Sequence, residues 1–162
     1  MNYTLFLIAL IPNLLPLKEK TISKNNMNIH WHFENDRVHF KINAPTSGWI
    51  AIGFNPNKGI KGSYLLMARV KNGKAEVVEH YTLSPGNYKS LESLGEKDLV
   101  ENVKGEELKN FSEVEFSLPI NSKTKYRYKL NPGMDYNLIM AFSRDDDFKH
   151  HSMMRTSTQI KL

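Results

Sequence analysis

The stretch Gly-Trp-Ile-Ala-Ile-Gly-Phe at residues 48–54 is apolar at almost every position. Successive side chains of an extended strand point to opposite faces, so this segment presents apolar side chains on both of its faces. A strand of that kind has to be covered on both sides. We therefore expect residues 48–54 to form a central strand of a sheet.

The two segments before it alternate between apolar and polar residues. Residues 27–33 and residues 37–44 each carry an apolar side chain at every second position, which is typical of strands with one buried face. The turn sequence Glu34-Asn35-Asp36 separates them. The inward side chains are Ile29, Trp31, Phe33, Val38, Phe40 and Ile42, and the outward ones include His30, His32 and His39.

The segments after it continue the same pattern. A loop at residues 55–62 leads to a mostly apolar strand at 63–70, and residues 74–82 return after Asn72-Gly73. That dipeptide suits a type I′ turn, which needs positive φ at both central positions. We therefore expect a hairpin there.

The second half of the chain is less regular. Residues 83–110 are mainly polar, with a short helical insert expected within 88–99 and a short edge strand at 101–103. Residues 126–134 are expected to form a loop with a short helix. Further strands are predicted at 112–118, 135–143 and 154–162.

These elements predict an all-β protein, an antiparallel β-sandwich of about eight to ten strands. The domain is expected to span residues 22–162. Residues 5–17 are apolar, too short to span a membrane as a helix and interrupted by Pro12 and Pro16. We interpret residues 1–21 as a secretory signal peptide, with an N-terminal membrane anchor as the alternative, and expect an exported protein, periplasmic or extracellular.

Composition narrows the function. The chain has no cysteine, which excludes disulfides and thiolate chemistry. Its formal net charge is +5, but the lysines are scattered among acidic residues rather than clustered, so nucleic-acid binding is not expected. No catalytic motif is present, and we do not expect an enzyme.

Four features together resemble a DOMON domain: Trp31, the run at 48–54, the Gly-Ile-Lys-Gly-Ser loop at 59–63, and His150-His151 before the last strand. The resemblance implies an immunoglobulin-like β-sandwich that binds haem b or, in other members, a sugar. In haem-binding members a loop Met and a His near the last strands hold the iron.

The resemblance assigns the His to His151, ahead of His150. At the loop Met position this chain has Ile60, and Tyr64 replaces an Asp that often follows the Gly-Ser step. Met67 and Lys61 are the main candidates for the second iron ligand, and Met140, Met153, Met154 and Lys58 are further candidates. The pocket is expected between residues 55–64 and 148–155, at the open end between the sheets, lined by Trp49, Phe54 and Leu66.

Simpler interpretations stay open. The two histidines can belong to a polar loop, with one of them bonded to Asp146 or Asp147, and the acidic run at 145–147 can be a solvated loop or a Ca²⁺ site. His30 and His32 share a strand face, but no third metal ligand is evident. Three functions are thus compatible with the sequence: a haem b domain for electron transfer or redox sensing with a partner protein, a haem-free module for a sugar or another small molecule, and a protein-interaction domain.

Overall fold

The computed structural model describes residues 18–162. The predicted signal peptide at residues 1–21 lies almost wholly outside the described residues. The first strand, β1 (Lys20–Lys24), begins two residues before the expected start of the domain at residue 22 and pairs with β2 (Met27–Glu34).

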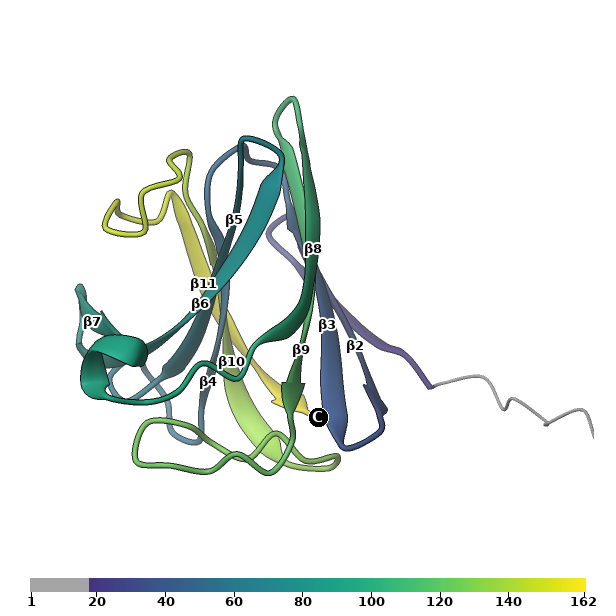
Figure 1. The fold of residues 1–162 in the computed structure, drawn as a ribbon, viewed down its shortest axis with the longest axis vertical. Coiled ribbons are helices and arrows are strands. Elements are labelled where there is room, and N and C mark those ends of the chain that lie inside the picture. Colours follow the sequence, from purple (N-terminus) through teal and green to yellow (C-terminus); the bar gives the residue numbers. More distant parts are fainter. Residues whose placement is uncertain (1–17) are drawn as a thin grey trace, which may run out of the picture.

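Two antiparallel sheets pack face to face (Figure 1), which confirms the predicted all-β sandwich. One sheet has the strand order β1-β2-β3-β9-β8 and the other β11-β10-β4-β5-β6-β7. The remaining strands are β3 (Arg37–Ala44), β4 (Ile50–Asn55), β5 (Tyr64–Lys71), β6 (Lys74–Ser84), β7 (Asn87–Ser90), β8 (Glu101–Leu108), β9 (Phe111–Pro119), β10 (Asp135–Phe142) and β11 (Met154–Lys161). The described residues thus form 11 strands, slightly more than expected, because β1 and β7 are too short for their alternation to be recognised.

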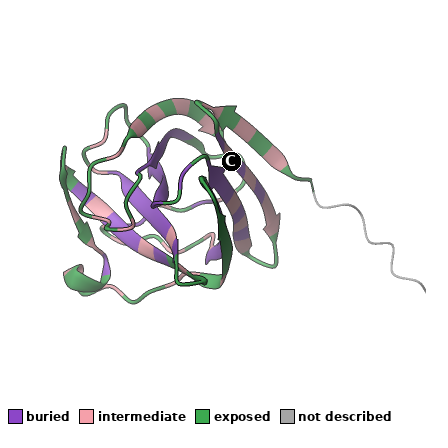
Figure 2. Ribbon diagram, turned by 90° about the horizontal axis from the view of Figure 1, so that it is seen from above, coloured by how far each residue is buried: buried purple, intermediate pink, exposed green. Residues whose placement is uncertain are grey.

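The main core fills the space between the sheets. Inward side chains such as Phe40, Phe54 and Phe116 form it, with ring centroids 5.6 Å apart from Phe40 to each of the other two. Figure 2 shows that buried residues gather between the sheets while the outermost strands are largely exposed. Burial of apolar surface in this layer is the main stabilising contribution to the fold.

Strand β4 is central, as the apolar run at 48–54 predicts. It lies between β10 and β5, and all six of its residues are buried. Ile50, Ile52 and Phe54 face the other sheet, whereas Ala51 faces outward. The six-stranded sheet therefore has an apolar outer face that needs a cover of its own.

The expected hairpin turns form. Asn72 and Gly73 have φ of 53° and 73°, and Asn35 and Asp36 have φ of 46° and 59°. Positive φ at both central positions matches the twist of the flanking strands. The turn at Asn35 and Asp36 sets the register of β2 and β3, in which His32 lies opposite His39.

The short helical insert expected within 88–99 is present as one 3₁₀ turn at Glu92–Leu94, which follows β7. The edge strand expected at 101–103 is present as β8 but is eight residues long, and its full length is hidden in the sequence because most of its side chains are exposed. The short helix expected within residues 126–134 is wrong, because these residues form no helix. Within residues 18–162, no helix has the length and apolar character required to cross a membrane.

Candidate functional site

The outer face of the six-stranded sheet carries a second apolar cluster, separate from the main core. Its members come from β4, β5 and β10 and the residue preceding β4, and they are Trp49, Ala51, Leu65, Met67, Ile139 and Ala141. Each is at most 6% exposed. A sheet face that is so little exposed to solvent must be covered by another segment. The β10–β11 loop (residues 143–153) forms much of this cover.

The start of this loop is fixed to β4 by backbone contacts. The Trp49 N–H donates to the Asp145 carbonyl at 3.1 Å, and the Ser143 N–H donates to the Trp49 carbonyl at 2.9 Å. Gly48 lies directly beneath, so close that an added Cβ would lie 2.4 Å from the Asp145 nitrogen. Only glycine permits this approach of two backbones.

The middle of the loop is held by side chains from β5 and β7. The Arg69 guanidinium lies 4.5 Å from the centre of the Phe148 ring and donates to the Asp146 carbonyl at 2.9 Å. The Tyr88 hydroxyl donates to the Phe148 carbonyl. These contacts combine a cation–π interaction with hydrogen bonds and fix the loop above the sheet.

His80, on β6, packs beneath this part of the loop. Its ring lies edge-on to Tyr88 at 5.4 Å and to Phe148 at 5.9 Å, and its Nδ1 is 3.0 Å from the Val78 carbonyl. Burial lowers the pKa of His80 below its ordinary value of 6.5, and the contact with the Val78 carbonyl opposes this only in part. The neutral ring is therefore the form that the fold favours.

A cavity of about 660 Å³, including its open mouth, lies between the loop and the sheet. The outer-face apolar cluster is its floor, and Ile60 and Tyr88 stand at its sides. Its remaining wall is formed by Lys149, His150, His151, Ser152 and Arg155.

Ile60 is placed by the β4–β5 loop (residues 56–63). The Asn55 side-chain amide donates to the carbonyls of Gly59 and Lys61 at 3.1 and 2.9 Å, and to the Ser63 hydroxyl at 3.1 Å. The bonds of this buried amide take the place of the backbone hydrogen bonds between strands that stop where β4 ends. The loop is thereby ordered and presents Ile60 to the apolar cluster.

The polar groups of the cavity are mainly hydrogen-bond donors. Lys149 and Arg155 contribute positive charge, and no carboxylate lines the cavity in the described part of the chain. The Trp49 Nε1–H is buried and has no partner among the described residues. A buried donor without a partner is costly unless a guest supplies an acceptor. The cavity therefore suits a guest with an apolar body and an anionic edge.

The structure brings together only some of the predicted site residues. Trp49, Ile60, Met67, His150 and His151 all line the cavity. Lys61 is exposed on the β4–β5 loop and does not line it. His150 is also exposed, with its Nδ1 3.6 Å from an Asp145 carboxylate oxygen.

The other expected lining residues face the opposite way. Phe54, Tyr64 and Leu66 point into the main core, because each lies one strand position away from a residue of the outer face. The cavity is therefore on the outside of the six-stranded sheet, and its expected position between the sheets is wrong. Met140 is likewise buried in the main core, and Met153 is exposed.

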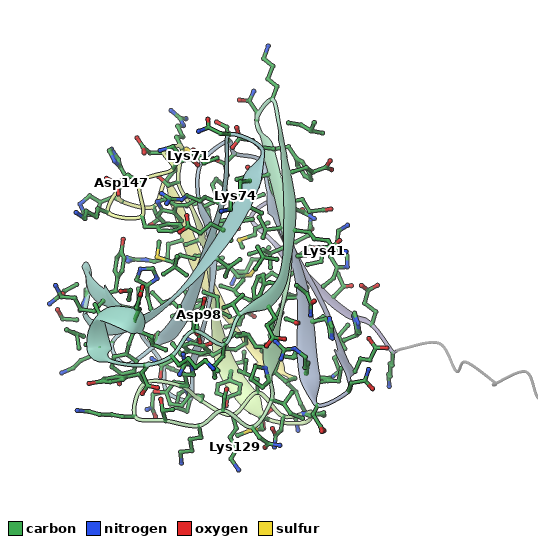
Figure 3. The ribbon with its side chains drawn as sticks, in the orientation of Figure 1. Lys41, Lys71, Lys74, Asp98, Lys129 and Asp147 are labelled. Atoms are coloured by element: carbon green, nitrogen blue, oxygen red, sulfur yellow. The ribbon has the colours of Figure 1, made fainter. Side chains whose placement is uncertain are left out.

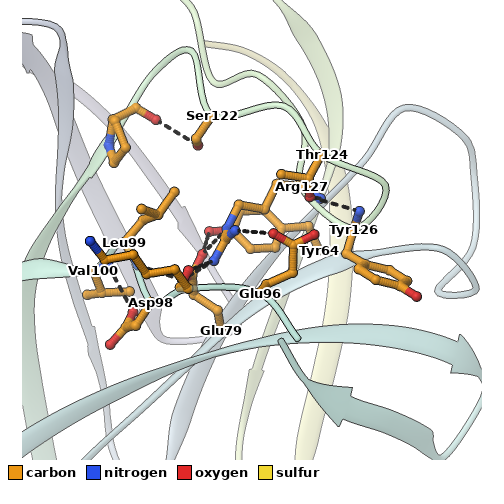
Figure 4. A network of polar contacts seen from close by, with 12 residues as sticks. Tyr64, Glu79, Glu96, Asp98, Leu99, Val100, Ser122, Thr124, Tyr126 and Arg127 are labelled. Atoms are coloured by element: carbon orange, nitrogen blue, oxygen red, sulfur yellow. Dashed lines mark hydrogen bonds and ion pairs between the residues drawn. The ribbon is translucent and has the colours of Figure 1, made fainter. Parts of the chain in front are cut away.

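Tyr64 belongs instead to a buried polar network (Figure 4). Its hydroxyl donates to Glu79 Oε1 at 2.5 Å, and Arg127 binds both oxygens of Glu79, at 2.7 and 2.8 Å. Burial and the neighbouring Glu79 raise the pKa of Tyr64 well above its ordinary value. Burial would raise the pKa of Glu79, but its bonds to Arg127 and Tyr64 outweigh that effect and lower it.

Sequence analysis misses Arg127 because the residue lies in a loop without periodicity. It is 2% exposed, and its third contact is Glu96 at 2.9 Å. The network has a structural role, because it fixes the β9–β10 loop (residues 120–134) to β6.

The chain is thus a two-sheet sandwich with a cavity covered by the β10–β11 loop. Comparison with known proteins shows the family to which it belongs. The DOMON domain family matches residues 23–143, about three quarters of the chain. The chain therefore belongs to the DOMON domain family.

Two solved structures share the fold. The cytochrome b domain of pyranose dehydrogenase from Coprinopsis cinerea superposes with a TM-score of 0.62 at 8% identity, covering 87% of this chain and 80% of that one. The cytochrome domain of Myriococcum thermophilum cellobiose dehydrogenase gives 0.61 at 8% identity, covering 90% and 82%. At this identity the likeness concerns the fold.

Proposed function

We propose that this chain is an exported haem b-binding domain that carries electrons to or from a partner protein, with haem held in the outer-face cavity and His151 as its iron ligand. The observation that supports the proposal is the cavity itself, whose lining combines an apolar sheet face with His151. The fold shared with two cytochrome domains supports it. Bound haem would supply one-electron chemistry.

The residues of the cavity fit the parts of haem b. An apolar floor containing Ala51 and Ala141 suits the flat macrocycle, since small side chains leave room above the strands. Arg155, Lys149 and the unpartnered Trp49 Nε1–H suit carboxylates on its edge. The His151 ring nitrogens have no hydrogen-bond partner among residues 18–162, which leaves a nitrogen free to bind iron.

The donor set supports a single protein ligand. Ile60, at the loop position where haem-binding relatives carry Met, offers no donor atom, and Lys61 lies outside the cavity. Met67 is the remaining candidate on the floor, but its side chain is 2% exposed and packed within the apolar cluster. We therefore infer haem bound through His151 alone among protein groups.

Titration of the purified chain with haemin tests this proposal. We expect a saturable Soret band at one equivalent, which shifts on reduction with dithionite. His151→Ala should abolish the band or change its position, whereas His150→Ala and His39→Ala, a histidine on the other sheet, should leave it intact. A titration that shows only free haemin, or a spectrum unaffected by His151→Ala, contradicts the assignment.

A haem-free ligand is the second candidate, favoured by Ile60 at the Met position. The cavity would then accept a small molecule with an apolar face and a carboxylate, or a sugar, against Trp49. Fluorescence of Trp49 that responds to such compounds while haemin gives no Soret band would select this function over the first.

A further inference from the structure

The outer face of the five-stranded sheet holds three potential metal ligands, His32 and Glu34 on β2 and His39 on β3. This face is remote from the cavity. Figure 3 shows Lys41, on the same strand as His39, and Asp147, on the loop that covers the cavity, on opposite sides of the molecule. The two sites can therefore be tested independently.

The tight turn at Asn35 and Asp36 brings the three ligands together. It sets a register in which His32 and His39 are directly opposite, and Glu34 follows His32 on the same face of β2. One donor atom from each residue lies within 4.8 Å of the other two. The two imidazole rings stack with centroids 4.8 Å apart and planes inclined by 7°.

The donor atoms are not committed to other partners. Among residues 18–162, no hydrogen bond or ion pair engages the side chains of His32, Glu34 or His39 within the usual distance limits. Arg37, paired with Glu34 across the hairpin, is itself engaged by Glu101 at 3.1 Å and by the Ser117 hydroxyl at 2.9 Å. The Glu34 carboxylate is thus left free.

The neighbouring histidine is excluded from the set by its own contact. His30 lies on the same face of β2, but its Nδ1 is 3.0 Å from the Thr21 hydroxyl of β1. The proposed ligand set is therefore limited to His32, Glu34 and His39.

From this geometry we propose that His32, Glu34 and His39 form a surface site for a divalent transition-metal ion. Two imidazole nitrogens and one carboxylate oxygen are a donor set used by Zn²⁺ and Cu²⁺, and the general order of affinities favours Cu²⁺. Both histidines are partly buried and Glu34 is exposed, so the remaining coordination positions face solvent.

Calorimetric titration with Cu²⁺ and with Zn²⁺, on the full chain without added haem, tests the site. We expect one equivalent of either metal to bind, with Cu²⁺ tighter. His39→Ala and His32→Ala should each weaken the affinity by about tenfold or more, since even loss of an outer partner of a metal ligand costs roughly 10- to 100-fold. His30→Ala and His150→Ala should bind as the wild type does.

Electron paramagnetic resonance of the Cu²⁺ form and amide NMR give a second measurement on the wild-type chain. Two coupled nitrogens in the spectrum, and broadening confined to residues near the β2–β3 turn, are expected. The proposal is overturned if neither metal binds, if His39→Ala and His32→Ala bind normally, if His30→Ala or His150→Ala removes binding equally, or if broadening centres on residues 145–151.

Discussion

At the scale of single residues, Arg127 is the charged side chain that is most deeply buried in the fold. It is a charged side chain buried in the main body of the domain and neutralised by a two-point contact with Glu79. Burial of a charge is tolerated only where a partner and hydrogen bonds replace water. Burial opposes the charged form of Arg127, yet the contact with Glu79 outweighs it and the pKa of Arg127 is raised.

Arg127→Met should lower the free energy of unfolding by about 3–5 kcal/mol, because it leaves Glu79 buried without its partner. Urea denaturation followed by circular dichroism measures this. The double variant Glu79→Leu with Arg127→Met should lose less than the sum of the single variants. Additive losses would mean that the two side chains do not stabilise one another.

His80 makes stability depend on pH. Its pKa is lowered in the folded state from 6.5, mainly by burial, so the stabilisation that it contributes is complete above about pH 6.5 and is lost as the pH falls through its folded value. We expect the free energy of unfolding to fall as the pH drops below about 6.5, and to fall less in His80→Phe. The pKa of His39 is also lowered, so His80→Phe removes only part of the slope.

Identical pH slopes for the wild type and His80→Phe would show that His80 does not couple protonation to folding. Phenylalanine keeps the edge contacts with Tyr88 and Phe148 and removes only the titrating group. The His39→Ala variant removes the histidine on the other sheet whose pKa is also lowered, so it should reduce the slope as well.

At the scale of elements, the sequence predicts strands better than it predicts what covers them. The apolar run at 48–54 indicates a strand covered on both faces, and β4 is one. Nothing in the pattern reveals that the β10–β11 loop is part of that cover, because the contact depends on Arg69, Tyr88 and Gly48, far away in the chain. The sequence pattern therefore predicts a pocket between the sheets, whereas the cavity lies on the outer face of the six-stranded sheet.

The same limit explains the other differences. His32 and His39 are both visible as outward residues, yet their pairing depends on the register that the turn sets. Only the first three residues of β8 are predicted from the sequence, because exposed edge strands carry few apolar residues. Alternation of apolar and polar residues indicates a strand with one buried face. A strand without a buried face therefore shows little of this alternation.

Gly48 links the two elements that frame the cavity. A Cβ there would lie within 2.6 Å of backbone atoms of Ser143, Arg144 and Asp145, which cannot move aside as a flexible side chain can. Gly48→Ala should destabilise the fold by about 1–3 kcal/mol, the usual effect of overpacking. It should also weaken haemin binding, because it displaces the loop that carries His151.

Thermal unfolding and haemin titration measure the two effects, with Ser47→Ala, an exposed neighbour, as the control. Wild-type stability and haemin affinity in Gly48→Ala would show that the loop is not held by this close approach.

At the scale of the whole molecule, the sandwich presents two chemically different outer faces. The six-stranded sheet carries the covered apolar cavity, and the five-stranded sheet carries the histidine cluster. Edge strands β1 and β11 are joined by Lys20 and Lys24, which donate to the carbonyls of Lys161 and Ser157 at 3.0 and 2.7 Å. These contacts link the two sheets along one edge. Because the main core fills the space between the sheets, both proposed sites lie on the outer faces.

Paramagnetic broadening of amide NMR signals by one equivalent of ferric haemin tests the central claim most directly, because it locates the guest on the molecule. We predict loss of signal from Ala51, Met67, Ile139 and His151, with signals from β2 and β3 retained. Broadening centred on the five-stranded sheet, or none at saturating haemin, would contradict a haem site beneath the β10–β11 loop.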